Sequence, residues 1–264
     1  MHHIAAVGLL LIGSQIWAAS PSVERSQQDR WIDLTHDLSS DAVFWPTAEP
    51  FELTTDAEGF TEAGYFYSAY SFRAAEHGGT HLDAPVHFAE GRQTTDEVPL
   101  SRLIGEAVVV DVRTQADRNR DYQLSVGDLE NFEKHHGRIE PGTIVLVRTG
   151  YSRFWPDAER YLGTAKRGAA GVAELSFPGI HPAAAQWLAA RHVASVGIDT
   201  ASIDYGRSKD FGTHVALMTE NVPAFENLAD LSALPPRGSF IVALPTKIRG
   251  GSGGPLRIVA RLPR

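Results

Sequence analysis

Cysteine is absent from the 264-residue chain, and this absence excludes several kinds of chemistry. Disulfides, thiolate nucleophiles, iron–sulfur clusters and cysteine-based structural zinc sites all need thiols. Any metal ion must therefore be held by histidine, aspartate or glutamate. The chain contains 11 histidines, although a histidine count alone decides nothing.

Runs of basic residues are also missing. The 32 acidic side chains outnumber the 24 basic ones, which gives a formal net charge of −8 at pH 7. A phosphate backbone or an anionic bilayer would find no cationic surface to bind. We therefore expect no nucleic-acid partner and no membrane association of the mature form.

The N-terminus carries an apolar run. Residues 1–19 combine a short apolar core, Ile4 to Ile12, with a small-residue end, which is typical of a secretory signal peptide. The alternative is an uncleaved apolar arm that packs on a neighbour. Residues 20–30 are polar and predict a flexible tether. No other segment approaches the roughly 18 apolar residues that cross a bilayer, so we expect a periplasmic or secreted protein.

Residues 31–264 predict a single domain, because no repeat or low-complexity linker interrupts them and 43% of the chain is apolar. Strand candidates at the start are Trp31–Thr35 and Tyr65–Ala75, with a loop that contains short extended pieces expected between Ser39 and Phe60. Three later runs have the β-branched content of buried strands: 107–112, 143–148 and 192–198.

Helical patterns alternate with these runs. One spans Val126–His135, where Ser125 can cap the start and Gly137 can end the helix, and another spans Pro182–Arg191. Alternating strands and helices favour an α/β fold with a mixed central sheet and some parallel pairing. Two late strands, 239–244 and 256–261, are joined by a glycine-rich stretch and are expected to close the sheet as an antiparallel edge.

One short stretch concentrates metal-ligating side chains. It holds three histidines and one aspartate within eleven positions: His77, His81, Asp83 and His87. Two glycines after His77 make a helix a poor choice and a tight loop a better one. His81 and Asp83 are two apart, so on an extended segment they point the same way. The pattern predicts a metal site, the alternative being loop histidines that bond backbone carbonyls.

A second group of ligand candidates lies later in the chain. His214 and Glu226 can converge if the chain turns at Pro223. The alternative is that Glu226 caps or pairs within a loop, and the pattern alone does not separate the two.

Both groups, with Gly197–Asp204, Pro245–Lys247 and Gly251–Arg257, resemble the cyclase-like metal-dependent hydrolase family, which contains bacterial kynurenine formamidase and isatin hydrolase. The likeness covers nearly all of the chain from Trp31 onward. It implies a swivelling β/α/β fold, a homodimer or homotetramer, and one or two divalent ions per subunit. Ligands of these types accept both Zn²⁺ and Mn²⁺.

The resemblance also implies roles for individual residues. His77, His81 and Asp83 would hold a first ion, and Asp83, His214 and Glu226 a second. His87 would be the catalytic acid and base. The chain reads Trp-Pro-Thr-Ala at 45–48, where the formamidase branch usually has a Pro-Gly-Asp turn, whereas isatin hydrolase looks mononuclear. The branch therefore stays open.

We expect a metal-activated water to hydrolyse an amide-type C–N bond in a small aromatic molecule, such as an N-formyl arylamine or a lactam. Four early aromatic residues are candidates for the wall of the substrate site, within one subunit or across a subunit interface: Phe44, Trp45, Phe60 and Tyr67. Plain core packing is their alternative. The rival functions are lactone or ester hydrolysis at the same site, and a periplasmic metal- and ligand-binding module without turnover.

Overall fold

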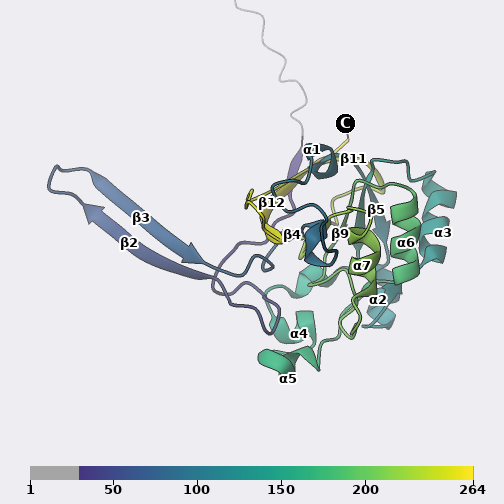
Figure 1. Ribbon diagram of the computed structural model, residues 1–264, viewed down its shortest axis with the longest axis horizontal. Coiled ribbons are helices and arrows are strands. Elements are labelled where there is room, and N and C mark those ends of the chain that lie inside the picture. Colours follow the sequence, from purple (N-terminus) through teal and green to yellow (C-terminus); the bar gives the residue numbers. More distant parts are fainter. Residues whose placement is uncertain (1–29, 264) are drawn as a thin grey trace, which may run out of the picture.

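The structure is a computed structural model that describes residues 30–263. The predicted signal peptide, 1–19, and all but the last residue of the predicted tether, 20–30, lie outside the described residues, so both stay predictions. Within the described part, a closed mixed sheet is covered by helices on one side, and a long two-stranded ribbon projects away from this body (Figure 1).

The main sheet has eight strands within residues 30–263, in the order β1-β12-β11-β5-β7-β9-β10-β4. Because β12 also pairs with β4, the sheet closes on itself. The strands are β1 Trp31–Asp33, β4 His81–Asp83, β5 Ile104–Asp111, β7 Ile144–Arg148, β9 Ser195–Ile198, β10 Ala224–Glu226, β11 Arg237–Pro245 and β12 Gly253–Arg261.

The four strands β5, β7, β9 and β10 run parallel, and the other pairings are antiparallel. The apolar runs of the parallel strands are buried on both faces, as their continuous β-branched composition predicts. In β7, Val145 and Val147 face the helices, whereas Ile144 and Leu146 face the interior of the closed sheet, since successive strand residues alternate in direction.

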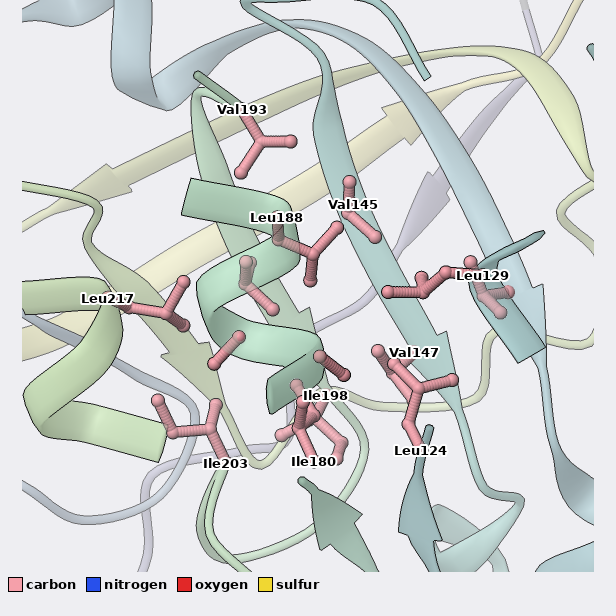
Figure 2. Packing of buried hydrophobic residues seen from close by; sticks show 14 of the residues in the cluster. Leu124, Leu129, Val145, Val147, Ile180, Leu188, Val193, Ile198, Ile203 and Leu217 are labelled. Carbon is pink, nitrogen blue, oxygen red and sulfur yellow. The ribbon is translucent and has the colours of Figure 1, made fainter. Parts of the chain in front are cut away.

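Three helices cover the outer face: α3 Val126–His136, α6 Pro182–Ala190 and α7 Gly212–Met218. Figure 2 shows the core between these helices and the sheet. Leu188 and Leu129 lie near Val145 and Val147 of β7, and Leu217 joins the same core from α7. Both predicted helices are confirmed. Ser125 forms a capping box with Asp128 at the start of α3, which ends at Gly137 with φ +87°.

The loop predicted over 39–60 is partly wrong, because β2 (Glu52–Phe60) pairs with β3 (Phe66–Arg73) as an antiparallel ribbon. Nearly every residue of β2 is exposed, so no buried face imposes the apolar alternation by which a strand is recognised. The strand predicted over 65–75 is confirmed as β3.

The late strands β11 and β12 are antiparallel and β12 closes the sheet, as predicted, but the expectation that they form an edge is wrong. β11 lies between β12 and β5, and β12 pairs with β11, β1 and β4. A closed sheet has no free edge at the strands that close it. The composition of β11 and β12 does not show which strands they pair with, so it could not reveal their place inside the sheet.

The remaining elements are short. They are η1 Pro85–His87, α1 Leu100–Leu103, α2 Arg113–Arg118, β6 Gln123–Leu124, η2 Tyr151–Phe154, α4 Ala158–Leu162, α5 Gly168–Val172 and β8 Gly179–Ile180. Across residues 30–263, no helix combines the length and the apolar character that a bilayer crossing needs.

Candidate functional site

The first group of predicted ligands sits at the start of β4. Gly79 adopts φ +62°, and a Cβ on Gly78 would lie 1.9 Å from the ring of Phe44, so the predicted tight loop requires both glycines. On β4, His81 and Asp83 share one side. The strand is buried throughout.

The second group comes from two neighbouring elements. His214 lies on α7 and Glu226 on β10. Because β10 pairs antiparallel with β4, Glu226 is opposite His81. The predicted convergence of His214 and Glu226 is confirmed: Nε2 of His214 lies 3.3 Å from Oε1 of Glu226.

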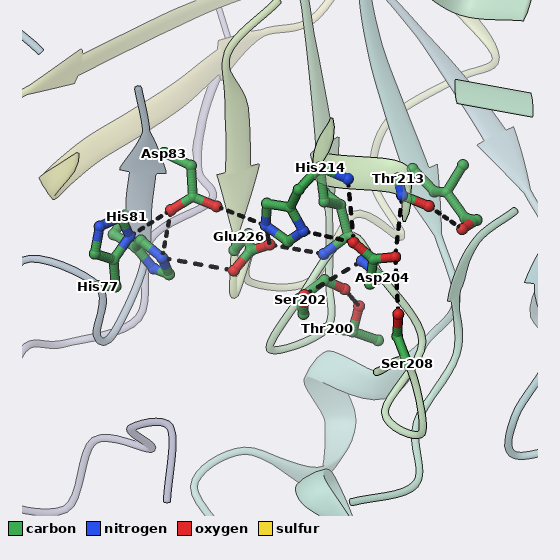
Figure 3. Close-up of polar contacts among 12 residues, drawn as sticks. His77, His81, Asp83, Thr200, Ser202, Asp204, Ser208, Thr213, His214 and Glu226 are labelled. Atoms are coloured by element: carbon green, nitrogen blue, oxygen red, sulfur yellow. Dashed lines mark hydrogen bonds and ion pairs between the residues drawn. The ribbon is translucent and has the colours of Figure 1, made fainter. Parts of the chain in front are cut away.

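Asp83 is the centre of the cluster (Figure 3). Its Oδ1 lies 2.6 Å from Nδ1 of His77 and 3.1 Å from Nε2 of His81, and its Oδ2 lies 3.2 Å from Nε2 of His214. Glu226 Oε2 lies 3.6 Å from Nε2 of His81. The five predicted ligands therefore meet at one place.

Each of the three imidazoles uses its second nitrogen for a contact outside the cluster. His77 Nε2 lies 2.9 Å from Oγ of Ser252, His81 Nδ1 lies 2.9 Å from the carbonyl oxygen of Gly79, and His214 Nδ1 lies 2.6 Å from Oδ2 of Asp204. Metal-ligating histidines are held in this way.

Nε2 of His81, the ring nitrogen that faces the carboxylates, tests whether these residues fit a metal ion. His81 is 2% exposed, and its buried Nε2 lies 3.1 Å from Oδ1 of Asp83 and 3.6 Å from Oε2 of Glu226 without a well-aligned hydrogen bond to either oxygen. A ring nitrogen and two carboxylates that face one another without well-aligned hydrogen bonds offer several donor atoms to one point, and a cation between them would satisfy all three groups. With only nitrogen and oxygen donors, the site fits a divalent ion of borderline or hard character.

The buried charges of the cluster balance one another. Burial favours the neutral form of Asp83, but the charges of His81 and His77 hold its pKa well below the usual value. Burial, followed by the charge of Asp83, raises the pKa of Glu226. Burial disfavours a charged His81, yet Asp83 and Glu226 raise its pKa to about 9. The two carboxylates thus attract positive charge, which a divalent cation can supply.

His87 lies on η1, beside the cluster. Its ring stacks on His77 with centroids 3.8 Å apart. The surrounding protein excludes water from the ring, and together with the nearby charged histidines it lowers the pKa of His87 to about 4, against the opposing effect of Asp83. By geometry His87 can also join His77 and Asp83 around an ion, while His81, Asp83 and Glu226 form a second such group. The roles that the resemblance implies, metal ligands for the other residues and acid and base for His87, stay predictions.

A cavity of about 300 Å³ opens onto the cluster. Its walls include three aromatic side chains: Trp45, Phe88 and Phe211. Phe88 and Phe211 rings lie 5.1 Å apart, and Phe88 lies 4.4 Å from the ring of His214. This combination of a flat apolar wall with a polar end suits a small aromatic molecule that presents a polar group.

Of the four predicted wall residues, the structure brings Trp45 to the cavity. Phe44 is 4% exposed and packs against Gly78, so for this residue the core-packing alternative is correct. Phe60 and Tyr67 lie on the projecting ribbon, 80% and 52% exposed, and do not line the cavity of their own subunit. Their role across a subunit interface stays a prediction.

Sequence reasoning missed several residues of the site. Phe88 directly follows His87, and this adjacency was an available signal. Phe211 has φ +49° and lies just before α7, which no pattern in the sequence indicates. Asp204 and Ser252 stand in stretches that carried the resemblance, but their spacing does not reveal that they contact histidines.

Comparison with known proteins decides the family. The model of the Cyclase family, described as "Putative cyclase", matches residues 32–205. The chain belongs to this family.

The cyclase-family relatives include enzymes of defined activity. A kynurenine formamidase from Salinibacter ruber is 32% identical over 234 residues, which are 87% of this chain and 96% of the relative. An isatin hydrolase from Roseibium aggregatum is 29% identical over 209 residues, 76% of this chain and 77% of the relative. Isatin hydrolase A from Ralstonia solanacearum, a solved structure, matches with a TM-score of 0.78 and 33% identity over 88% of this chain and 92% of that chain.

These similarities confirm the predicted cyclase-like family and its mixed α/β fold. The predicted enzyme class, a hydrolase of amide-type C–N bonds, agrees with the names of the relatives. A divalent metal agrees with the grouping of His, Asp and Glu side chains.

Proposed function

We propose that the chain hydrolyses an amide-type C–N bond in a small aromatic molecule with the help of one or two divalent ions, Zn²⁺ or Mn²⁺. The observation that carries the proposal is the convergence of five side chains on one point, with each imidazole held from outside: His77, His81, Asp83, His214 and Glu226. The names of the relatives support the reaction class.

The ion would supply two effects when bound, since it polarises a carbonyl and lowers the pKa of a bound water towards neutrality. The side chains around the ion would hold the ligands in place and balance its charge. Asp83 is shared by all three imidazoles. Asp204 and Ser252 fix two of the rings in place, so the ligands need little reorganisation.

His87 is our candidate for proton transfer. Because its pKa lies near 4, the ring is neutral at pH 7 and one nitrogen is free to accept a proton from the attacking water. The same nitrogen can return that proton to the leaving nitrogen of the amide. The ring lines the cavity, which places it within reach of a bound substrate.

The cavity limits the substrate to a small molecule, because about 300 Å³ lies at the lower end of ligand pockets. Trp45, Phe88 and Phe211 would contact an aryl ring, while the amide carbonyl points to the histidine cluster. Isatin, a bicyclic lactam, and N-formyl arylamines have this form.

The ribbon β2–β3 supports a homo-oligomer built from copies of this chain, a dimer or a tetramer. Among the described residues it pairs only with itself, and a lone hairpin is at best marginally stable in water. About half or more of the surface of seven large side chains is exposed on it: Leu53, Phe60, Tyr65, Phe66, Tyr67, Tyr70 and Phe72. Such a patch is typical of an interface.

A second copy is the partner we favour, because the ribbon is continuous with the rim of the cavity. Ala75, two residues beyond β3, lines the cavity. A symmetric pair can therefore exchange ribbons between the two cavities, which would bring Phe60 and Tyr67 to the neighbouring site. We further propose export of the chain by residues 1–19, which N-terminal sequencing of periplasmic protein tests.

The reaction is tested with purified protein carrying stoichiometric Zn²⁺ or Mn²⁺. We expect it to hydrolyse isatin or an N-formyl arylamine faster than an aromatic lactone of similar size. Turnover of the lactone alone would replace this proposal with an ester hydrolase. Stoichiometric metal without any turnover would favour the binding module.

A further inference from the structure

The glycine-rich loop between β11 and β12 carries a serine that contacts the candidate ligand His77. Oγ of Ser252 lies 2.9 Å from Nε2 of His77 and 2.8 Å from Oε2 of Glu76. The backbone N–H of Ser252 donates to the same carboxylate oxygen over 3.0 Å. Glu76, Ser252 and His77 thus form a continuous chain that ends at Asp83.

The backbone of this loop is anchored on both sides of the serine. The N–H of Thr95 donates to the carbonyl oxygen of Gly251 over 2.9 Å, and its hydroxyl lies 3.0 and 3.1 Å from the carbonyl oxygens of Gly251 and Gly253. The N–H of Ala84 donates to the carbonyl oxygen of Ser252 over 2.8 Å. Ser252 is therefore held in place by the residue that directly follows β4, the strand that carries the candidate ligands His81 and Asp83.

The glycines beside Ser252 allow this close approach. A Cβ on Gly251 would lie 2.7 Å from Oε1 of Glu76, and a Cβ on Gly253 would lie 2.5 Å from Cε1 of His77. Any larger residue would push the loop away from the motif. In the sequence, these glycines indicated only a connection between two strands. In the structure, they allow the hydroxyl of Ser252 to reach His77.

The carboxylate of Glu76 decides which atoms donate in the hydrogen bonds that link Glu76, Ser252 and His77. A carboxylate accepts and never donates, so the single hydroxyl proton of Ser252 goes to Glu76. The oxygen of Ser252 must then accept a hydrogen from Nε2 of His77. Nδ1 of the same ring lies 2.6 Å from Oδ1 of Asp83. Since this carboxylate also only accepts, a proton or a cation must lie between the two atoms, and a bound divalent ion would take that place.

Ser252, His77 and Asp83 also have the order of a serine-hydrolase triad. Two observations exclude a nucleophilic serine. Its proton is donated to Glu76 rather than to the imidazole, and Ser252 is absent from the described residues that line the cavity.

We propose that Glu76 and Ser252 are positioning residues, which fix His77 as its Nε2–H tautomer and present Nδ1 to the metal. This inference rests on the proposed function, because it concerns a ligand of the proposed ion. Neither residue contacts the substrate. Together they extend the metal site to the glycine-rich loop.

Zinc affinity, measured by competition with a chromogenic chelator, tests the proposal. Ser252→Ala and Glu76→Ala should each weaken binding by about 10- to 100-fold, as loss of such outer contacts does. Glu76→Gln should restore near-normal affinity, since its amide oxygen can accept both hydrogen bonds. The control is Asp96→Ala, which removes a bond to Gly250 N in the same loop without reaching His77, and should leave affinity unchanged.

The tautomer itself can be read without a variant. Imidazole ¹⁵N–¹H spectra of the zinc-loaded protein should show a proton on Nε2 of His77 and zinc at Nδ1. Zinc at Nε2, or unchanged affinity in Ser252→Ala, would overturn this inference alone. A wild-type protein that binds no divalent ion would overturn the proposed function and this inference together.

Discussion

Nδ1 of His214 lies 2.6 Å from Oδ2 of Asp204. The same carboxylate accepts the backbone N–H groups of Thr213 and His214 over 3.1 Å each. Burial works against ionisation of Asp204, but its hydrogen bond to His214 lowers the pKa of the carboxyl below its usual value. Asp204 therefore holds the helix start and the ring together, and directs Nε2 of His214 to Asp83 and Glu226.

Replacement of this carboxylate tests whether it orients the ligand. In Asp204→Asn we expect metal affinity to fall by about 10- to 100-fold. The neutral amide has only one accepting oxygen, so it cannot replace all three hydrogen bonds of the carboxylate, and those that remain are weaker. Isothermal titration of the metal measures the change. Unchanged affinity in a folded variant would show that His214 needs no such partner.

The roles of two histidines separate in a pair of variants. His81→Ala should lose bound metal, because it removes the buried nitrogen that faces both carboxylates of the site. His87→Ala should retain metal and lose most of its turnover, a loss typically of about 10²- to 10⁴-fold for a general acid or base. Elemental analysis beside kcat measures both. If His87→Ala also loses its metal, His87 is a ligand.

Acid should destabilise the fold through His36, outside the metal cluster. Its ring stacks on Trp155 at a centroid distance of 4.2 Å, and its Nε2 is buried without a partner among the described residues. Burial lowers the pKa of His36 to about 4, although Asp37 and a backbone contact to Leu228 oppose this. The unfolded chain, with a pKa near 6.5, then binds more protons than the folded one between about pH 6.5 and 4.

The contribution of neutral His36 to the free energy of unfolding is therefore fully present above about pH 6.5 and is lost as the pH falls towards 4. At pH 5 the loss from this one group is about 2 kcal/mol. His36→Phe keeps a ring on Trp155 and has no proton to bind, so its stability should depend less on pH. Urea unfolding at pH 7.5 and pH 5 measures the difference. Equal losses in both proteins would rule out His36 as the cause.

The projecting ribbon should hold subunits together. Phe72→Asp places a charge on a ribbon residue that is 65% exposed, and we expect it to shift the protein towards monomer in light scattering. Leu100→Asp, at a residue of α1 that is 64% exposed, is the matched control and should leave the oligomer intact. A wild-type monomer would contradict the oligomer.

Much of the fold and of the site followed from local patterns. The β-branched run at 143–148 was recognisable because both faces of β7 are buried. Ser125 and Gly137 marked the ends of α3 through short-range capping. The candidate site residues between 77 and 87 were recognisable because they lie within eleven positions of one another.

What local patterns could not show depends on contacts between distant residues. Ser252 meets His77 across 175 positions, and only the closure of the sheet by β12 brings them together. The strand β2 has no buried face to produce alternation. Phe60 and Tyr67 looked like core or wall residues, yet their surroundings within one subunit are solvent.

Reconstitution with metal tests the central claim most directly. Protein stripped by a chelator is titrated with Zn²⁺ or Mn²⁺ while hydrolysis of isatin or an N-formyl arylamine is followed. The account predicts no hydrolysis before addition, a rise with each increment, and a break at one or two equivalents per subunit. Full hydrolysis by the stripped protein would contradict it.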